Sequence, residues 1–196
     1  LKEGVSRRDG SVLDFYIDWE RTQAYSLGLG MVFLNLEGRE PQGIVKREEA
    51  DGLMAEISQR FLEYQDPETG LKVGQDATIM KDLYPGDWGS ADYVCADIMF
   101  GFAENYRVEW NNVLGRITLA TEDGETVLGP IVKDNSNNWS GDHASNSPHL
   151  VTGIFFSSQP VEVPEDGVSV MHIAPTVLER LGVERPEVLL PALARR

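Results

Sequence analysis

A short apolar run followed by a long amphipathic segment is the feature that most constrains the fold of this chain. Residues 31–36, Met-Val-Phe-Leu-Asn-Leu, end before Gly38 and predict a buried or half-buried strand followed by a turn. In residues 46–64 apolar side chains recur at helical spacing between charged ones, which predicts a helix with one face on a core. Pro67 and Gly70 favour a turn after this helix. A strand next to an amphipathic helix indicates a mixed α/β fold.

The rest of the chain continues this alternation of strands, turns and helices. Residues 117–120 and 126–132 flank Asp123-Gly124, and an Asp-Gly pair between two apolar runs predicts a β-hairpin. Residues 174–182 predict a helix, with proline in its first turn and glycine just past its end. Further strands are predicted over residues 12–17, 77–80, 92–102, 151–156 and 168–170. The expected class is therefore α/β, with a β-hairpin and flanking helices.

The charge balance narrows the range of partners. The chain has 17 Lys and Arg against 32 Asp and Glu, a formal net charge of −15, and no block of basic residues. Such a chain offers no electrostatic footprint for nucleic acid and little attraction to an anionic membrane. It also lacks an apolar run long enough to span a bilayer. We expect no nucleic-acid partner and no membrane partner.

Length and cysteine content bear on domain organisation. At about 150 residues per domain, a chain of 196 residues suits a single domain over residues 1–196. The single cysteine, Cys95, cannot form an internal disulfide, and its setting predicts a buried strand position. The opening Leu1-Lys2-Glu3-Gly4 has neither an initiator Met nor a signal peptide, so we expect the chain to be a piece of a longer protein.

Residues 133–148 are the segment with the strongest signs of chemistry. They are crowded with Asn, Ser, Asp and Gly, and loops of this length are often functional. His143 lies in this segment, directly after Asp142, which can accept a hydrogen bond, and Gly141, which permits a sharp turn. His143 is therefore a candidate metal ligand, and an ordinary loop histidine is the alternative.

The other candidate residues favour structural roles. No phosphate-binding P-loop, nucleophile elbow, His-Glu-x-x-His or Cys-x-x-Cys motif occurs. His149 follows a proline and precedes a predicted strand, which favours a structural hydrogen bond. His172 precedes the last helix, which favours a capping or packing role.

Five stretches, taken in order, carry a family resemblance. They are DWERTQAYSLG at residues 18–28, FLNLEGREPQGIV at 33–45, GF and YRVEW within 101–110, WSGDH at 139–143 and IAPTVL at 173–178. Together they resemble the type I phosphodiesterase/nucleotide pyrophosphatase-like members of the alkaline phosphatase superfamily, in which this ordered set belongs to the C-terminal half. The resemblance implies part of an alkaline-phosphatase-like three-layer sandwich.

The resemblance also implies a chemistry. The family uses a pair of zinc ions, held by Asp and His residues, and a Ser or Thr nucleophile to hydrolyse phosphate esters, and the two metals stabilise the attacking and leaving oxygens. His143 matches the last metal-binding histidine of the family, and Asp142 matches a residue that we expect to orient it. Neither Thr22 nor Ser140 stands in the context of the family's nucleophile.

The chain also departs from the family pattern. The nucleophile motif, the first metal-binding Asp and the Asp-His pair that normally precede this region have no counterpart here. We therefore expect the chain to be the C-terminal portion of a larger metal-dependent phosphohydrolase domain. The complete domain would take a small-molecule phosphate ester as its substrate, whereas this chain alone should be inactive. Apolar surface left exposed by the missing part should promote self-association. A non-catalytic binding or interaction module remains an alternative, as does a sulfatase or phosphomutase of the same superfamily.

Overall fold

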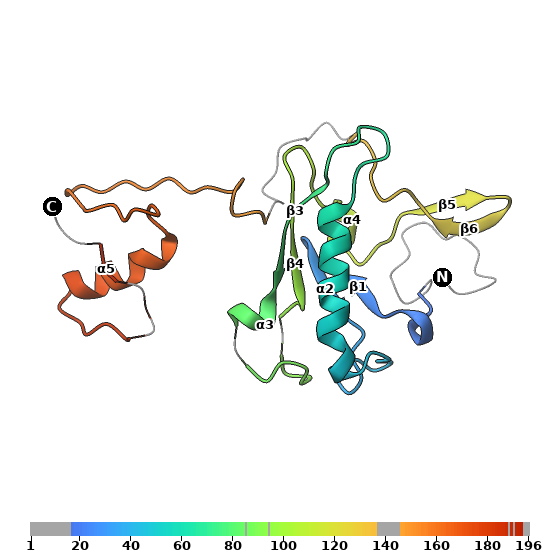
Figure 1. Cartoon of the computed structure of the whole chain (residues 1–196), viewed down its shortest axis with the longest axis horizontal. Helices are drawn as coiled ribbons and strands as arrows, with labels where there is room; N and C mark the ends of the chain where they lie inside the picture. Colours follow the sequence, from blue (N-terminus) through green and yellow to red (C-terminus); the bar gives the residue numbers. More distant parts are fainter. Residues whose placement is uncertain are drawn as a thin grey trace. The chain divides into compact units, whose positions relative to one another are not determined.

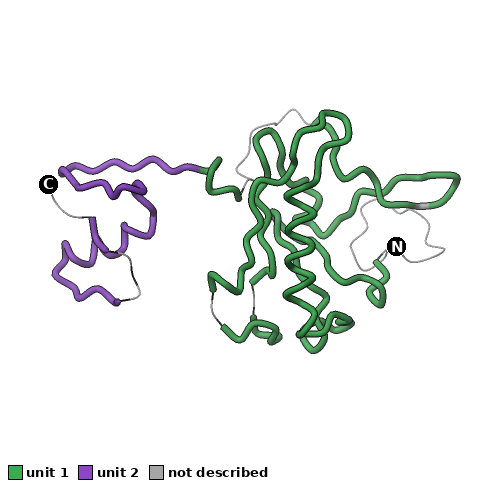
Figure 2. Tube along the Cα trace, in the orientation of Figure 1, with its two compact units in different colours: residues 1–151 green, residues 152–196 purple. Residues whose placement is uncertain are grey.

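The computed structural model describes residues 17–84, 86–93, 95–136, 146–187, 189 and 191–193. It divides the chain into two units, residues 1–151 and residues 152–196, which Figure 2 shows in green and purple. The expectation of a single domain over residues 1–196 stays a prediction. None of the described helices is both long and apolar enough to cross a membrane.

The first unit is built on a four-stranded antiparallel sheet. Its strands are β1 (Ala24–Ser26), β2 (Met31–Leu34), β3 (Gly74–Ile79) and β4 (Ile98–Phe102), in the spatial order β1-β2-β4-β3. Strand β3 therefore lies at one edge, and its pairing with β4 shifts register between Gly74 and Asp76. The structure is thus mixed α/β, as the sequence predicts.

Helix α2 (Arg47–Glu63) packs on this sheet (Figure 1). Acidic residues occupy its first turn and Arg60 its last, which suits the helix dipole. Towards its C-terminal end, Phe61 stacks on Phe100 of β4 with ring centroids 3.8 Å apart. The buried core between sheet and helix consists of Val32, Leu34, Leu36, Val45, Ala50, Met54 and Ile98.

Smaller elements complete the two units. The first unit also contains the 3-10 helix η1 (Trp19–Arg21), the short helices α3 (Met80–Leu83) and α4 (Trp110–Val113), and the hairpin strands β5 (Leu119–Glu122) and β6 (Glu125–Leu128). The second unit contains the 3-10 helix η2 (Val170–His172) and helix α5 (Ile173–Arg180). The predicted hairpin and both predicted helices are confirmed.

Several predicted strands need correction. Strand β4 begins only at Ile98, because residues 87–93 form successive turns, so the strand predicted over 92–102 is too long and Cys95 is only partly buried outside it. Residues 151–156 contain no strand, and the strand predicted over 168–170 runs into η2 instead. The strand predicted over 12–17 lies outside the described residues except for Ile17.

Candidate functional site

The two residues that the resemblance assigns to a metal centre, His143 and Asp142, lie outside the described residues, within the gap at 137–145. The structure describes the chain on both sides of this gap. The surroundings of the candidate site are therefore built from the sheet and from the residues that directly follow the gap.

Two side chains that follow the gap are fixed to the sheet. The Asn146 side-chain amide donates a hydrogen bond to the Leu29 carbonyl and lies 3.3 Å from Met99 Sδ in β4. The hydroxyl of Ser147, which is fully buried, donates to Asp76 Oδ2 in the edge strand β3. Asn146 and Ser147, three and four positions after His143, thus anchor the chain to the inner strand β4 and to the edge strand β3.

Two glycines make this close approach to the sheet feasible. Gly30 has a φ of +77°, and a Cβ there would lie 3.0 Å from Asn146 Nδ2. A Cβ on Gly101 of β4 would lie 2.9 Å from Ser147 Cα and 3.0 Å from Asp76 Cβ. Any side chain at Gly101 would therefore push the anchored residues away from the sheet.

Asp76 connects Ser147 with a histidine. His149 Nε2 lies 3.5 Å from Asp76 Oδ1, and the His149 side chain is 72% exposed. A serine nucleophile needs a base such as histidine to take its proton, whereas the Ser147 proton is directed at a carboxylate. Ser147 and Asp76 therefore anchor the chain. His149, for which the sequence favours a structural hydrogen bond, is exposed and makes this 3.5 Å contact with Asp76 instead.

A second polar cluster lies beneath the loop that follows β2. The Arg39 guanidinium binds the Asp97 carboxylate through two hydrogen bonds of 2.8 and 2.7 Å. The same carboxylate accepts hydrogen bonds from Trp88 Nε1 at 2.8 Å and from the Leu34 N–H at 2.6 Å. Because four donors satisfy Asp97, this buried ion pair holds the loop against the sheet.

Asn35, which directly follows β2, ties the beginning of this loop to its end. Its side-chain amide donates to the carbonyls of Trp19, Thr22 and Gln42, at 3.0, 2.9 and 2.9 Å. Its own carbonyl accepts from the Val45 N–H at 2.9 Å. Asn35 and Arg39, two polar residues of the stretch 33–45, therefore serve the architecture of the fold.

His172 has the structural role that its position predicts. Its Nδ1 accepts a hydrogen bond of 3.0 Å from the Ser169 N–H, and the Ser169 side chain accepts from the backbone of η2. The capping contact stabilises the turn just before α5.

Sequence reasoning did not find Asp76, Ser147 or Asp97. Asp97 had one available signal, since a charged residue just before a buried apolar strand needs a partner. Asp76 and Ser147 are brought together by the packing of β3 against the chain near residue 147. A contact between residues so far apart in the sequence leaves no local pattern that could predict it.

The described residues do not by themselves fit a zinc site. Among residues 17–136 and 146–193, as far as these are described, no group of three or more His, Cys, Asp and Glu side chains is placed to hold a metal ion. No protein-family model, curated protein or solved structure matches this chain.

Proposed function

We propose that this chain is the C-terminal portion of a metal-dependent phosphohydrolase that acts on phosphate esters. In this proposal His143 is one zinc ligand, Asp142 orients it, and the two lie in an alkaline-phosphatase-like three-layer sandwich. Further polypeptide supplies the nucleophile and the remaining ligands. The five ordered stretches of residues support the proposed chemistry.

The observation that carries the proposal is the exposure of the apolar run at residues 151–156. Ile154 and Phe156 are 84% and 87% exposed, whereas Val32 and Leu34 in β2 are buried. A continuous apolar run of this length is typical of a strand buried on both faces in a parallel sheet. A larger phosphohydrolase sheet would bury this run, and contiguous exposed apolar surface is typical of a site that another part of a protein covers.

The anchor at Ser147 gives a physical role to the residues around His143. A metal ligand must be held in place before the metal binds, because loose ligands lose affinity. Ser147 lies four positions after His143 and is fixed to Asp76 and packed on Gly101. In the proposed enzyme, strands β3 and β4 therefore hold the chain at Ser147, four positions after His143.

The isolated chain provides the first test. We expect no hydrolysis of nitrophenyl phosphate or bis(nitrophenyl) phosphate in the presence of zinc, because the nucleophile and most metal ligands have no counterpart in this sequence. Robust hydrolysis that disappears in His143→Ala would contradict the proposal that the chain is only a portion of the enzyme.

The coding sequence ahead of Leu1 provides the second test. The proposal requires a metal-binding Asp, then a Ser or Thr nucleophile, then an Asp-His pair in the same reading frame. A longer protein without these residues would support the non-catalytic module instead.

A further inference from the structure

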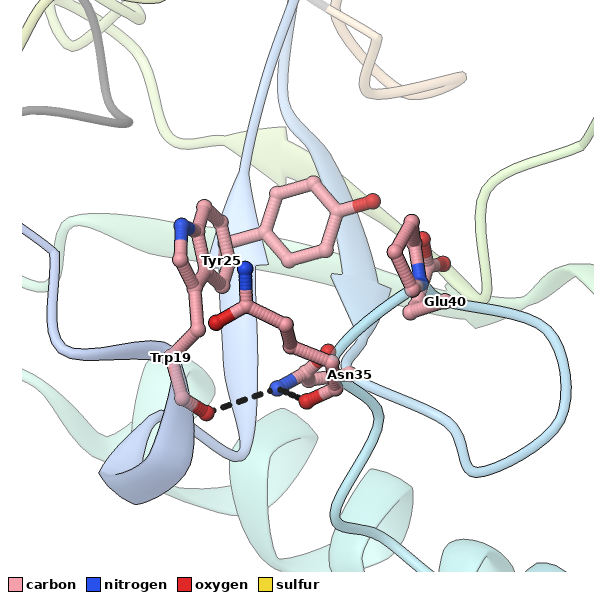
Figure 3. A pocket seen from close by; sticks show the side chains of 6 residues that line it. Trp19, Tyr25, Asn35 and Glu40 are labelled. Atoms are coloured by element: carbon pink, nitrogen blue, oxygen red, sulfur yellow. Dashed lines mark hydrogen bonds between the residues drawn. The ribbon is translucent and has the colours of Figure 1, made fainter.

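A small cavity of the first unit lies beside strand β1 and the loop that follows β2. Its volume is about 250 Å³, slightly below the usual range for drug-sized ligands, so it suits a small molecule. Figure 3 shows Trp19, Tyr25, Asn35 and Glu40 around it. The lining residues are Trp19, Tyr25, Asn35, Glu40, Pro41 and Gln42.

Two aromatic rings form a corner of this cavity. The ring planes of Trp19 and Tyr25 are at 90°, with centroids 5.3 Å apart, and Phe33 stacks on Tyr25 at 5.4 Å. Rings at a right angle cannot both stack on one flat ligand. They suit a compact, rounded group that touches both rings at once.

The charges around the cavity favour a cation. Among the described residues that line it, Glu40 is the only charged one. The neighbouring Arg39 is shared between Glu40, at 3.1 Å, and the Asp97 carboxylate, so two carboxylates face one guanidinium and one negative charge is left over. Burial, followed by the charge of Glu40, raises the pKa of Tyr25 to about 12, so its phenol stays neutral at physiological pH.

The cavity is also largely preformed. The amide of Asn35 donates to the carbonyls of Trp19 and Gln42, two residues that line the cavity, at 3.0 and 2.9 Å. A wall that is already fixed loses little conformational freedom when a ligand binds. Pro41 and Gln42 are exposed and give access from solvent.

We propose that this cavity binds a small organic ammonium ion, with the cation against the rings of Trp19 and Tyr25 and with Glu40 as its counter-ion. Aromatic corners bind quaternary ammonium groups through the negative face of the ring, and a carboxylate adds charge attraction. The cavity is lined by described residues of the first unit, and ammonium binding there does not depend on metal chemistry at His143.

The test compares choline with dimethylbutanol, its uncharged carbon isostere, by calorimetric titration of the purified chain. We expect saturable binding of choline and binding of the isostere at least about tenfold weaker. Equal binding of the two probes, or no saturable binding of choline by the folded chain, would overturn the proposal.

A pair of variants tests the counter-ion. Glu40→Gln should weaken choline binding about tenfold and leave binding of the isostere unchanged, whereas the exposed Glu37→Gln should change neither. Thermal unfolding of each variant shows that it is folded. A folded Glu40→Gln protein that binds choline as well as the wild type would contradict the role of Glu40.

Discussion

At the scale of single residues, polar side chains organise the first unit more than the sequence suggests. Asp97 is fully buried and Arg39 is 6% exposed in its side chain, yet the two form a bidentate ion pair. Removing one member of such a pair leaves an uncompensated buried charge. In the sequence, Gly38, Arg39 and Glu40 form part of the stretch that carries the family resemblance. In the structure, Arg39 holds the loop against the sheet.

Replacing Asp97 should therefore destabilise the fold strongly. We expect Asp97→Asn to lower the free energy of unfolding in urea by about 3–5 kcal/mol, because Arg39 would keep its charge without a carboxylate partner. The matched control is Asp51→Asn, which breaks an exposed ion pair with Lys81 and should cost less than about 1 kcal/mol. Similar losses in the two variants would show that the Arg39–Asp97 pair does not stabilise the fold.

Asp66 gives the fold a defined pH dependence. The Glu68 N–H, followed by the hydroxyls of Tyr106 and Thr69, holds the pKa of Asp66 below its usual value. The folded state therefore favours the charged carboxylate. The resulting stabilisation is complete above the usual pKa of an aspartate and is lost as the pH falls through the lowered pKa.

The pH dependence can be measured by comparing the wild type with Asp66→Asn. The difference in unfolding free energy between the two should be constant near neutral pH and should shrink in acid, as Asp66 becomes protonated in the folded state. Glu68→Gln, which leaves the Glu68 N–H in place, should show no such change. A difference between wild type and Asp66→Asn that does not vary in acid would refute this linkage.

At the scale of elements, local patterns predicted the elements that depend on local contacts. The helix expected over 46–64 is α2, Arg47–Glu63, and the Asp-Gly hairpin turn has positive φ at Asp123 and Gly124, as its type requires. The strand expected over 151–156 failed because a strand exists only with a partner. An apolar pattern indicates that a segment needs burial, but it does not indicate whether a neighbouring strand is present to pair with it.

The contact between β4 and the chain near residue 147 is an element-scale feature that can be tested. We expect Gly101→Ala to lower the unfolding free energy by about 1–3 kcal/mol, because its Cβ would press on Ser147 and Asp76. Gly52→Ala in α2, where a Cβ meets nothing within 4 Å, should instead raise it by about 0.5–1 kcal/mol. Thermal unfolding of both variants measures the contrast, and a stabilising Gly101→Ala would show that the approach is not tight.

At the scale of the whole molecule, the main feature is the uneven burial of apolar side chains. The first unit has a core between α2 and its sheet, whereas the described residues of the second unit bury little beyond Pro175 and Leu193. A net charge of −15 opposes association of the chain with itself, and exposed apolar side chains favour it. Exposed apolar surface is what the resemblance leads one to expect, and whether a larger fold covers it stays a prediction.

The purified chain should therefore bind a hydrophobic dye and self-associate at high ionic strength, where its charge is screened. Replacing both Ile154 and Phe156 by serine should lower dye fluorescence and the associated fraction in sedimentation. Ile131→Ser, which removes an apolar side chain that is exposed outside this run, should have a smaller effect. A monomer that binds no dye would indicate that residues 151–156 need no partner.

The proposed function depends most directly on one histidine. The decisive measurement is the zinc content, by elemental analysis, of the longer protein that the proposal requires and of its His143→Ala variant, with His149→Ala as the matched control. The proposal predicts that zinc occupancy falls in His143→Ala together with hydrolysis of phosphate esters, while His149→Ala retains its zinc. Unchanged zinc content in His143→Ala would contradict it.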